Sequence, residues 1–167
     1  MGPQGPAGSP ISLYDSTNTL VAPVVNLGCQ QFTSDQRGPF THATVLLTIG
    51  GRTYPLCVTR DGFAASTSAL FYTSLDCSGQ AFINSSNYTL LPSSSSNSLL
   101  SGYIAVVIGG GHLILYRPDY DFGVQNLNFH SYLAGVVCNS WDTTGDAYKP
   151  IEVADLTATY PSPLSVK

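Results

Sequence analysis

The pattern of apolar and polar residues along the chain is that of short β-strands. It is clearest over residues 41–49, where Ala43, Val45, Leu47 and Ile49 share one face and His42, Thr44, Leu46 and Thr48 share the other. Gly50-Gly51 then predicts a hairpin turn, because glycine adopts positive φ without steric cost. A return strand is expected over residues 52–59.

Other short apolar runs, separated by polar or glycine-rich turns, predict further strands. They cover 11–14, 19–27, 70–73, 80–83, 103–108 and 112–116, with weaker patterns at 132–138, 147–153 and 156–160. The apolar period of a long helix occurs nowhere, so we expect little helix and an all-β fold, a compact antiparallel sandwich or barrel-like domain. The run at 103–108 is apolar on all sides, which indicates burial on both faces. In an oligomer, a neighbouring subunit could cover one of them.

The first residues follow a different repeat. Three consecutive triplets, Gly2-Pro3-Gln4, Gly5-Pro6-Ala7 and Gly8-Ser9-Pro10, have glycine at every third position. Collagen requires this period because only glycine fits at the axis of three chains. A flexible linker is the alternative, but the strict register with two Gly-Pro steps favours collagen. We therefore divide the chain into the end of a collagen-like stalk (1–10), a β-rich head (11–160) and a tail (161–167).

A collagen-like stalk has a consequence for assembly. Three triplets are too few to hold a triple helix alone, and a globular trimer beside the repeat would keep three chain ends at high effective concentration. We expect the head to form a homotrimer with three-fold (C3) symmetry that aligns the stalk. A monomeric domain merely attached to a stalk is the alternative.

The composition limits the partners and the cellular location that we expect for this protein. Hydrophobic residues make up 43% of the chain and charged residues 10%, against roughly 25% charged in ordinary soluble domains. The net charge of −4, with only six Lys and Arg, argues against a nucleic-acid partner. No apolar run reaches the roughly 18 residues needed to span a bilayer. No leader pattern follows Met1, so we expect an export signal upstream of an excised fragment and an extracellular, secreted or cell-surface location.

The four cysteines, Cys29, Cys57, Cys77 and Cys138, contain no CxxC pair, which gives little support to a metal site. An even count allows up to two disulfides in any of three pairings. Buried free thiols are the alternative.

Signals for catalysis are weak. His42, His112 and His130 are scattered outside any HExxH pattern, and no GxSxG motif is present. Asp119, Asp121 and Asp142 could join a histidine, but turn capping is the favoured interpretation. The acidic stretches at 119–121 and 142–146 could bind calcium, but turn capping explains them better. We predict a non-enzymatic domain with no metal and no cofactor.

Cations suggest a polyanion partner instead. The candidates are Arg37, Arg52, Arg60, Arg117 and Lys149, and the arginine fork suits sulfate groups. Three-fold symmetry would gather these charges into a patch despite the negative total. The alternative is that each is a solvated surface residue or pairs with a nearby acid. Ten tyrosines are present; exposed ones could stack on sugar rings, although most are expected in the core.

Several short segments carry a family resemblance over residues 11–84. They are LYDSTNTLVAPVV from Leu13, GRTY from Gly51, TRDGF from Thr59 and FYTSLDCSG from Phe71. They resemble bacterial surface and secreted domains in which a YD–N–LV hairpin precedes a Y-T–DCSG strand and turn, often after collagen-like repeats. The layout is similar to that of the Legionella collagen-like adhesin.

The resemblance implies an extracellular trimer that binds sulfated glycosaminoglycan and supports cell adhesion and biofilm formation. No site residue can be carried over by motif. The alternative function is a structural trimerisation module of a phage tail-fibre-type protein, in which collagen-like triplets also occur.

Overall fold

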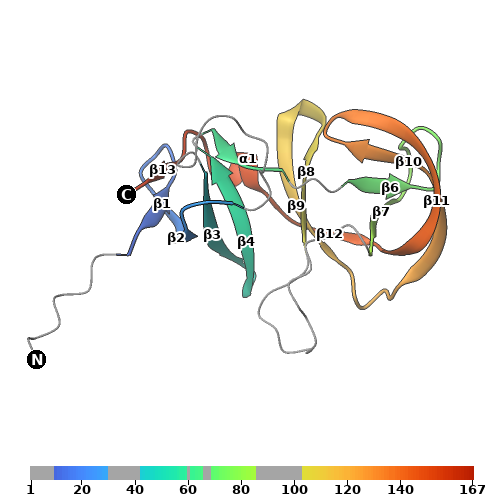
Figure 1. Cartoon of the computed structure of the whole chain (residues 1–167), viewed down its shortest axis with the longest axis horizontal. Helices are drawn as coiled ribbons and strands as arrows, with labels where there is room; N and C mark the ends of the chain where they lie inside the picture. The colour runs from blue at the N-terminus through green and yellow to red at the C-terminus, as the bar shows by residue number, and fades with distance from the viewer. Residues whose placement is uncertain (1–9, 30–41, 60, 66–68, 86–102) are drawn as a thin grey trace, which may run out of the picture.

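The computed structural model describes residues 10–29, 42–59, 61–65, 69–85 and 103–167. The triplets before Pro10, the polar tract at 93–98, Arg37 and Arg60 lie outside them. The fold is all-β with antiparallel sheets, as the sequence predicts. Three layers follow one another along the long axis: a large sheet, a three-stranded sheet and a small barrel (Figure 1).

The first layer is a six-stranded sheet in the order β13-β1-β2-β3-β4-β5. Its strands are β1 (Ser12–Tyr14), β2 (Leu20–Asn26), β3 (His42–Ile49), β4 (Arg52–Thr59), β5 (Gly62–Phe63) and β13 (Ser165–Val166). The turn at Gly50-Gly51 forms as expected, with φ of 57° and 75°. Residues 161–167 belong to this layer, because β13 pairs with β1 and Leu164 is buried.

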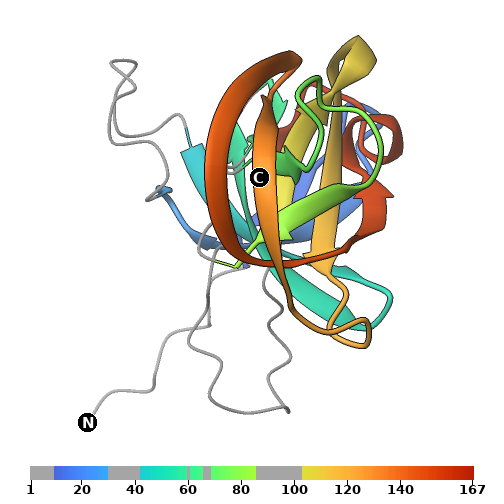
Figure 2. The same ribbon diagram turned by 90° about the vertical axis from the view of Figure 1, so that its right-hand side faces the viewer.

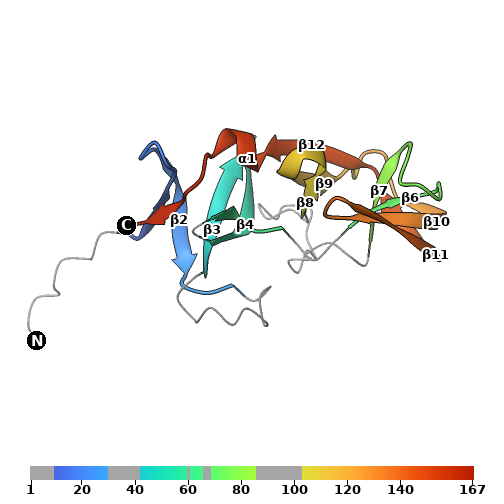
Figure 3. The ribbon, with the colours of Figure 1, turned by 90° about the horizontal axis from the view of Figure 1, so that it is seen from above.

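The second layer, in the order β12-β9-β8, lies in the middle of the molecule (Figures 1 and 3). It consists of β8 (Ile104–Ile108), β9 (His112–Pro118) and β12 (Pro150–Asp155), with a short 3-10 turn, η1 (Gly109–Gly111), joining β8 to β9. A single helical turn, α1 (Leu156–Thr159), follows β12 where the sequence predicted a strand. The Asp155 carboxylate accepts a hydrogen bond from the Ala158 amide and caps this turn, which explains the difference.

The third layer is a closed barrel of four strands in the order β10-β11-β7-β6. The strands are β6 (Leu70–Tyr72), β7 (Ala81–Asn84), β10 (Gln125–Ala134) and β11 (Val137–Tyr148). The expected strand at 132–138 is instead the tip of the long β10–β11 hairpin, because Gly135 adopts φ of 63° and turns the chain. Figure 2 shows this curved hairpin in orange.

The central hairpin β8–β9 is buried on both faces, as its sequence indicates. One face contributes Tyr103, Ala105, Leu113 and Leu115 to the large core shared with the six-stranded sheet. The other contributes Ile104 and Val106 to a cluster with Leu70, Tyr72 and Ile83 of the barrel. The suggestion that a neighbouring subunit covers the second face is therefore wrong: the same chain supplies both partners. No helix in the described ranges is long and apolar enough to cross a bilayer.

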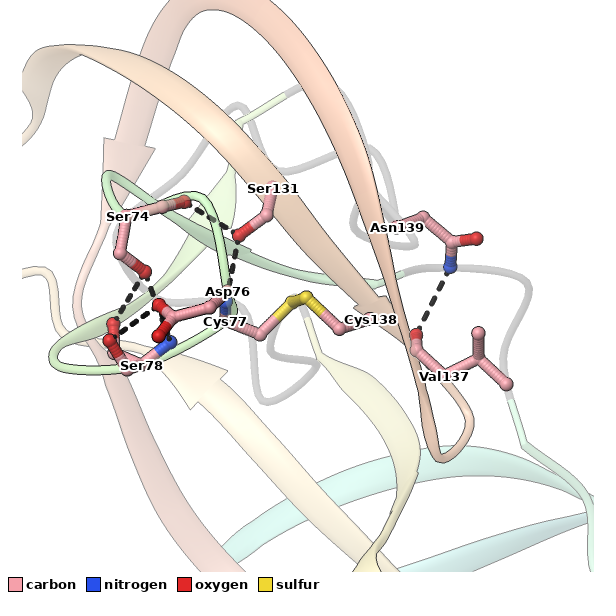
Figure 4. Close-up of a disulfide and its surroundings, with 8 residues drawn as sticks. All are labelled: Ser74, Asp76, Cys77, Ser78, Ser131, Val137, Cys138 and Asn139. Atoms are coloured by element: carbon pink, nitrogen blue, oxygen red, sulfur yellow. Dashed lines mark hydrogen bonds between the residues drawn. A yellow bond between two sulfur atoms is a disulfide. The ribbon is translucent and has the colours of Figure 1, made fainter.

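Two disulfides form, so the free-thiol alternative is wrong. Cys29 bonds to Cys57 and Cys77 to Cys138, each with 5.9 Å between Cα atoms. Buried Ser131 supports the second bridge: its hydroxyl accepts from the Cys77 amide at 3.0 Å and donates to the Ser74 carbonyl at 2.7 Å (Figure 4). The bridge and the Ser131 bonds together fix the β6–β7 connection to the β10–β11 hairpin.

Asp15 organises the turn between β1 and β2. One carboxylate oxygen accepts from the Thr17 hydroxyl at 2.7 Å and from the Thr17 and Thr19 amides at 2.9 Å each. The hydrogen bond from the Thr17 side chain, followed by that from the Thr19 backbone, lowers the pKa of Asp15.

A lowered pKa predicts how Asp15→Asn changes stability with pH. Stabilisation by this carboxylate is present above its unfolded pKa of about 4 and is lost as pH falls through the lower folded pKa. The melting temperature of the wild type should exceed that of Asp15→Asn near neutral pH, and the gap should close in acid. Asp121→Asn makes the same charge change in an exposed turn and is the matched control for the loss of one negative charge. A gap that is constant with pH would contradict the prediction.

Candidate functional site

The connection between β9 and β10 and the junction between β11 and β12 lie against each other. β9 pairs with β12 through Pro118–Pro150, and the Asp119 amide donates to the Lys149 carbonyl at 2.8 Å. One Asp119 carboxylate oxygen accepts from the amides of Asp121 and Phe122 at 3.2 and 3.3 Å. This is the turn capping expected of an aspartate here, and it presents the intervening side chains outward.

Aromatic side chains dominate this corner. Tyr120 and Phe122 expose 46% and 43% of their surface. The Tyr120 ring packs edge-on against Tyr148, with centroids 5.3 Å apart. The Lys149 ammonium lies 3.7 Å from the centroid of the Phe122 ring, a cation–π contact. The corner therefore combines half-exposed rings with a positive charge.

Two arginines from different sheets add to that charge. Arg117 stands on β9, and Arg52 begins β4 of the large sheet. Burial, and then Tyr148, raise the pKa of the Tyr120 hydroxyl, whereas the charges of Arg52 and Arg117 lower it. Burial also raises the pKa of Tyr54, and the charges of the same two arginines lower it. Both guanidinium groups are thus close enough to influence the same pair of hydroxyls.

We call this region the cation–aromatic surface. Its residues are Arg52, Arg117, Tyr120, Phe122, Tyr148 and Lys149. The turn between β3 and β4, beside Arg52, and the β9–β10 connection both reach the lower end of the molecule in Figures 1 and 2. Of the five cations that the sequence suggests, the fold brings these three together, and Arg37 and Arg60 lie outside the described residues. The aromatic partners were not singled out from sequence, although Tyr120 and Phe122 alternate with turn-forming residues in the PDYDFG stretch.

Two histidine–aspartate pairs also form. His112 Nδ1 lies 2.6 Å from Asp155 Oδ2, and His130 Nδ1 lies 2.7 Å from Asp142 Oδ1. Asp142 therefore joins a histidine from within β11 rather than capping a turn, contrary to the sequence-based interpretation. Ser131, which follows His130, is buried and already uses its hydroxyl at the disulfide. It is therefore unavailable as a nucleophile for this pair.

The second pair belongs to a series of polar contacts across the β10–β11 hairpin. They are Asn126 Nδ2 to Asp146 Oδ1 at 2.8 Å, Thr144 Oγ1 to Asn128 Oδ1 at 2.6 Å, and His130 to Asp142. Four of these side chains, Asn128, His130, Asp142 and Thr144, line part of an open hollow of about 510 Å³. Within the described ranges, no three His, Cys, Asp or Glu residues cluster as a metal site would require.

Comparisons with protein-family models, curated proteins and solved structures give no match to this chain.

Proposed function

We propose that this domain is the non-catalytic, trimer-forming head of an extracellular collagen-like protein, and that its cation–aromatic surface binds a sulfated polysaccharide. The proposal that the domain binds polysaccharide rests on one observation. Three cations, Arg52, Arg117 and Lys149, lie beside the half-exposed rings of Tyr120 and Phe122. The triplets at residues 2–10 support the proposal that the domain forms a trimer. Two disulfides support an oxidising setting outside the cytoplasm.

The chemistry of the surface suits a sulfated sugar for two reasons. Guanidinium groups present planar donor forks that match sulfate oxygens. Aromatic faces pack against the C–H surface of a sugar ring and do not depend on charge. A neutral polysaccharide would use only the rings, and a small anion only the cations. The combination therefore favours a polymer that is both sugar and anion, such as a glycosaminoglycan.

Assembly would strengthen such binding. A repeating polysaccharide can contact more than one copy of the surface, and each linked contact raises the effective concentration for the next. This gives useful avidity although the chain as a whole carries a charge of −4.

The test is retention on immobilised heparin. Arg52→Ala/Arg117→Ala should weaken binding at least about tenfold, because a hydrogen bond to a charged group contributes roughly 1.5 kcal/mol or more. Elution of the wild type should come earlier as salt rises, since salt screens these contacts.

Single substitutions provide a matched control. Arg117→Ala and Lys167→Ala remove the same charge, but Lys167 lies beside Tyr14 at the β1–β13 edge of the large sheet. Only Arg117→Ala should shift elution. Equal shifts would show that net charge, not this surface, governs retention. A trimer that binds no polysaccharide would leave the structural trimerisation role alone.

A further inference from the structure

Among the described residues, the outer face of β1, β2 and β3 in the large sheet carries no formal charge. The segments of β1 (SLY), β2 (LVAPVVN) and β3 (HATVLLTI) contain no aspartate, glutamate, lysine or arginine. Their inward residues, including Leu13, Ala22 and Val45, form the large core. Cross-strand partners share a face, so Tyr14 and Leu20, which pair with each other next to the buried Leu13–Ala22 pair, lie on the outer side.

Apolar side chains are exposed along β2 and just beyond it. Leu20, Val25 and Leu27 expose 60%, 52% and 58% of their surface. Single exposed apolar residues are ordinary, but three within residues 20–27, beside strands that carry no formal charge, resemble the centre of a protein interface. Within the described ranges, the positive charge of Lys167 lies at the margin, 5.2 Å from the Tyr14 ring, and its ammonium hydrogen-bonds to Asn18.

The position of this face relative to the stalk identifies its partner. The Gly-X-Y triplets end at Pro10, and β1 begins at Ser12. Three chains of a triple helix run around one common axis, and the four residue-to-residue steps from Gly8 to Ser12 span at most about 14 Å. The first strands of three copies must therefore meet close to that axis, and β2 is the neighbour of β1.

The sheet edge cannot make this contact by adding strands across β1. Backbone hydrogen bonds join Ser12 and Lys167 in both directions, at 2.9 and 3.0 Å, so β13 covers the edge of β1 and, being only two residues long, offers little backbone to a further strand. Figures 1 and 3 show the described chain beginning and ending at this end of the molecule, opposite the barrel. Copies that meet here do so through the uncharged face.

We propose that Leu20, Val25 and Leu27 form the centre of a three-fold interface between copies of this chain, at the stalk end of the head. This inference rests on the trimeric assembly in the proposed function and specifies where that assembly is made.

The experiment measures mass by light scattering coupled to size-exclusion chromatography. The wild type should be a trimer at micromolar concentration. Leu20→Asp and Val25→Asp should each raise the concentration needed for assembly more than about a hundredfold, because three carboxylates would face one another near the axis. Val137→Asp, at 58% exposure in the barrel, is the matched control and should remain trimeric.

The outcomes separate the two proposals. A monomeric wild type would overturn the assembly itself. A trimeric wild type with trimeric Leu20→Asp and Val25→Asp variants would overturn only this location. Should either variant fail to fold, hydroxyl-radical footprinting of the wild type decides the question. Leu20, Val25 and Leu27 should become protected as protein concentration rises, while Val136 and Val137 stay reactive; equal reactivity at all concentrations would contradict the interface.

Discussion

Replacing Cys77 and Cys138 with serine is expected to lower the free energy of unfolding by about 4 kcal/mol. The bridge joins residues 61 positions apart, and a longer closed loop restricts the unfolded chain more strongly. It also ties the β6–β7 connection to β11, while the hydrogen bonds of Ser131 tie the same connection to β10 (Figure 4). Urea unfolding followed by far-ultraviolet circular dichroism measures the loss.

The other disulfide provides the matched comparison. Cys29→Ser/Cys57→Ser opens a separation of 28 positions, for which the same relation gives about 3.5 kcal/mol. Both double variants should therefore be strongly destabilised, with the Cys77 pair somewhat more affected. A loss below about 1 kcal/mol for Cys77→Ser/Cys138→Ser would contradict a structural role for that bridge.

Local signals in the sequence predict the hairpins β3–β4 and β8–β9 well. The alternation at Ala43, Val45 and Leu47 places these residues in the core, where they are buried. Glycines at 50–51 and 109–111 mark the two hairpin turns. In each case a short stretch contains both the apolar strand pattern and the glycine turn, so the prediction needs no information about distant residues.

The barrel is harder to predict because its strands are polar on one side. Asn126, Asn128 and His130 alternate with Leu127 and Phe129, which is a period of two. Asparagine has low strand propensity, so the pattern reads as a loop. What stabilises it is contact with partners on β11, such as the hydrogen bond between Asn128 and Thr144. Those partners are fixed only when the barrel closes.

The candidate site shows the same limit. Sequence alone can name Arg52, Arg117 and Lys149 as cations, but it cannot bring them together, because Arg52 and Arg117 stand on different sheets. Burial of the 103–108 strand on both faces was predictable from its composition. The identity of the covering layers was not, since the partners Leu70 and Ile83 lie on strands far apart along the chain.

Phe129→Ala is expected to cost about 3–5 kcal/mol, the range for removing a buried phenylalanine. The side chain is fully buried in the barrel, with its ring centroid 5.5 Å from Phe71 and 6.1 Å from Phe82. Truncation would leave a cavity among residues that cannot collapse, because strands close the barrel around them. Leu75→Ala, at an exposed position, should change stability by no more than about 0.5 kcal/mol.

Two probes show whether the barrel unfolds with the rest of the protein. Trp141, the single tryptophan, lies on β11 with its ring 5.8 Å from Tyr132, so its fluorescence reports on the barrel, whereas circular dichroism reports on all sheets. Ile104 and Val106 of the central hairpin pack against barrel residues. For that reason, the two unfolding midpoints in Phe129→Ala should fall together. A fluorescence midpoint well below that of circular dichroism would instead show that the barrel unfolds as a separate unit and that this packing couples the layers weakly.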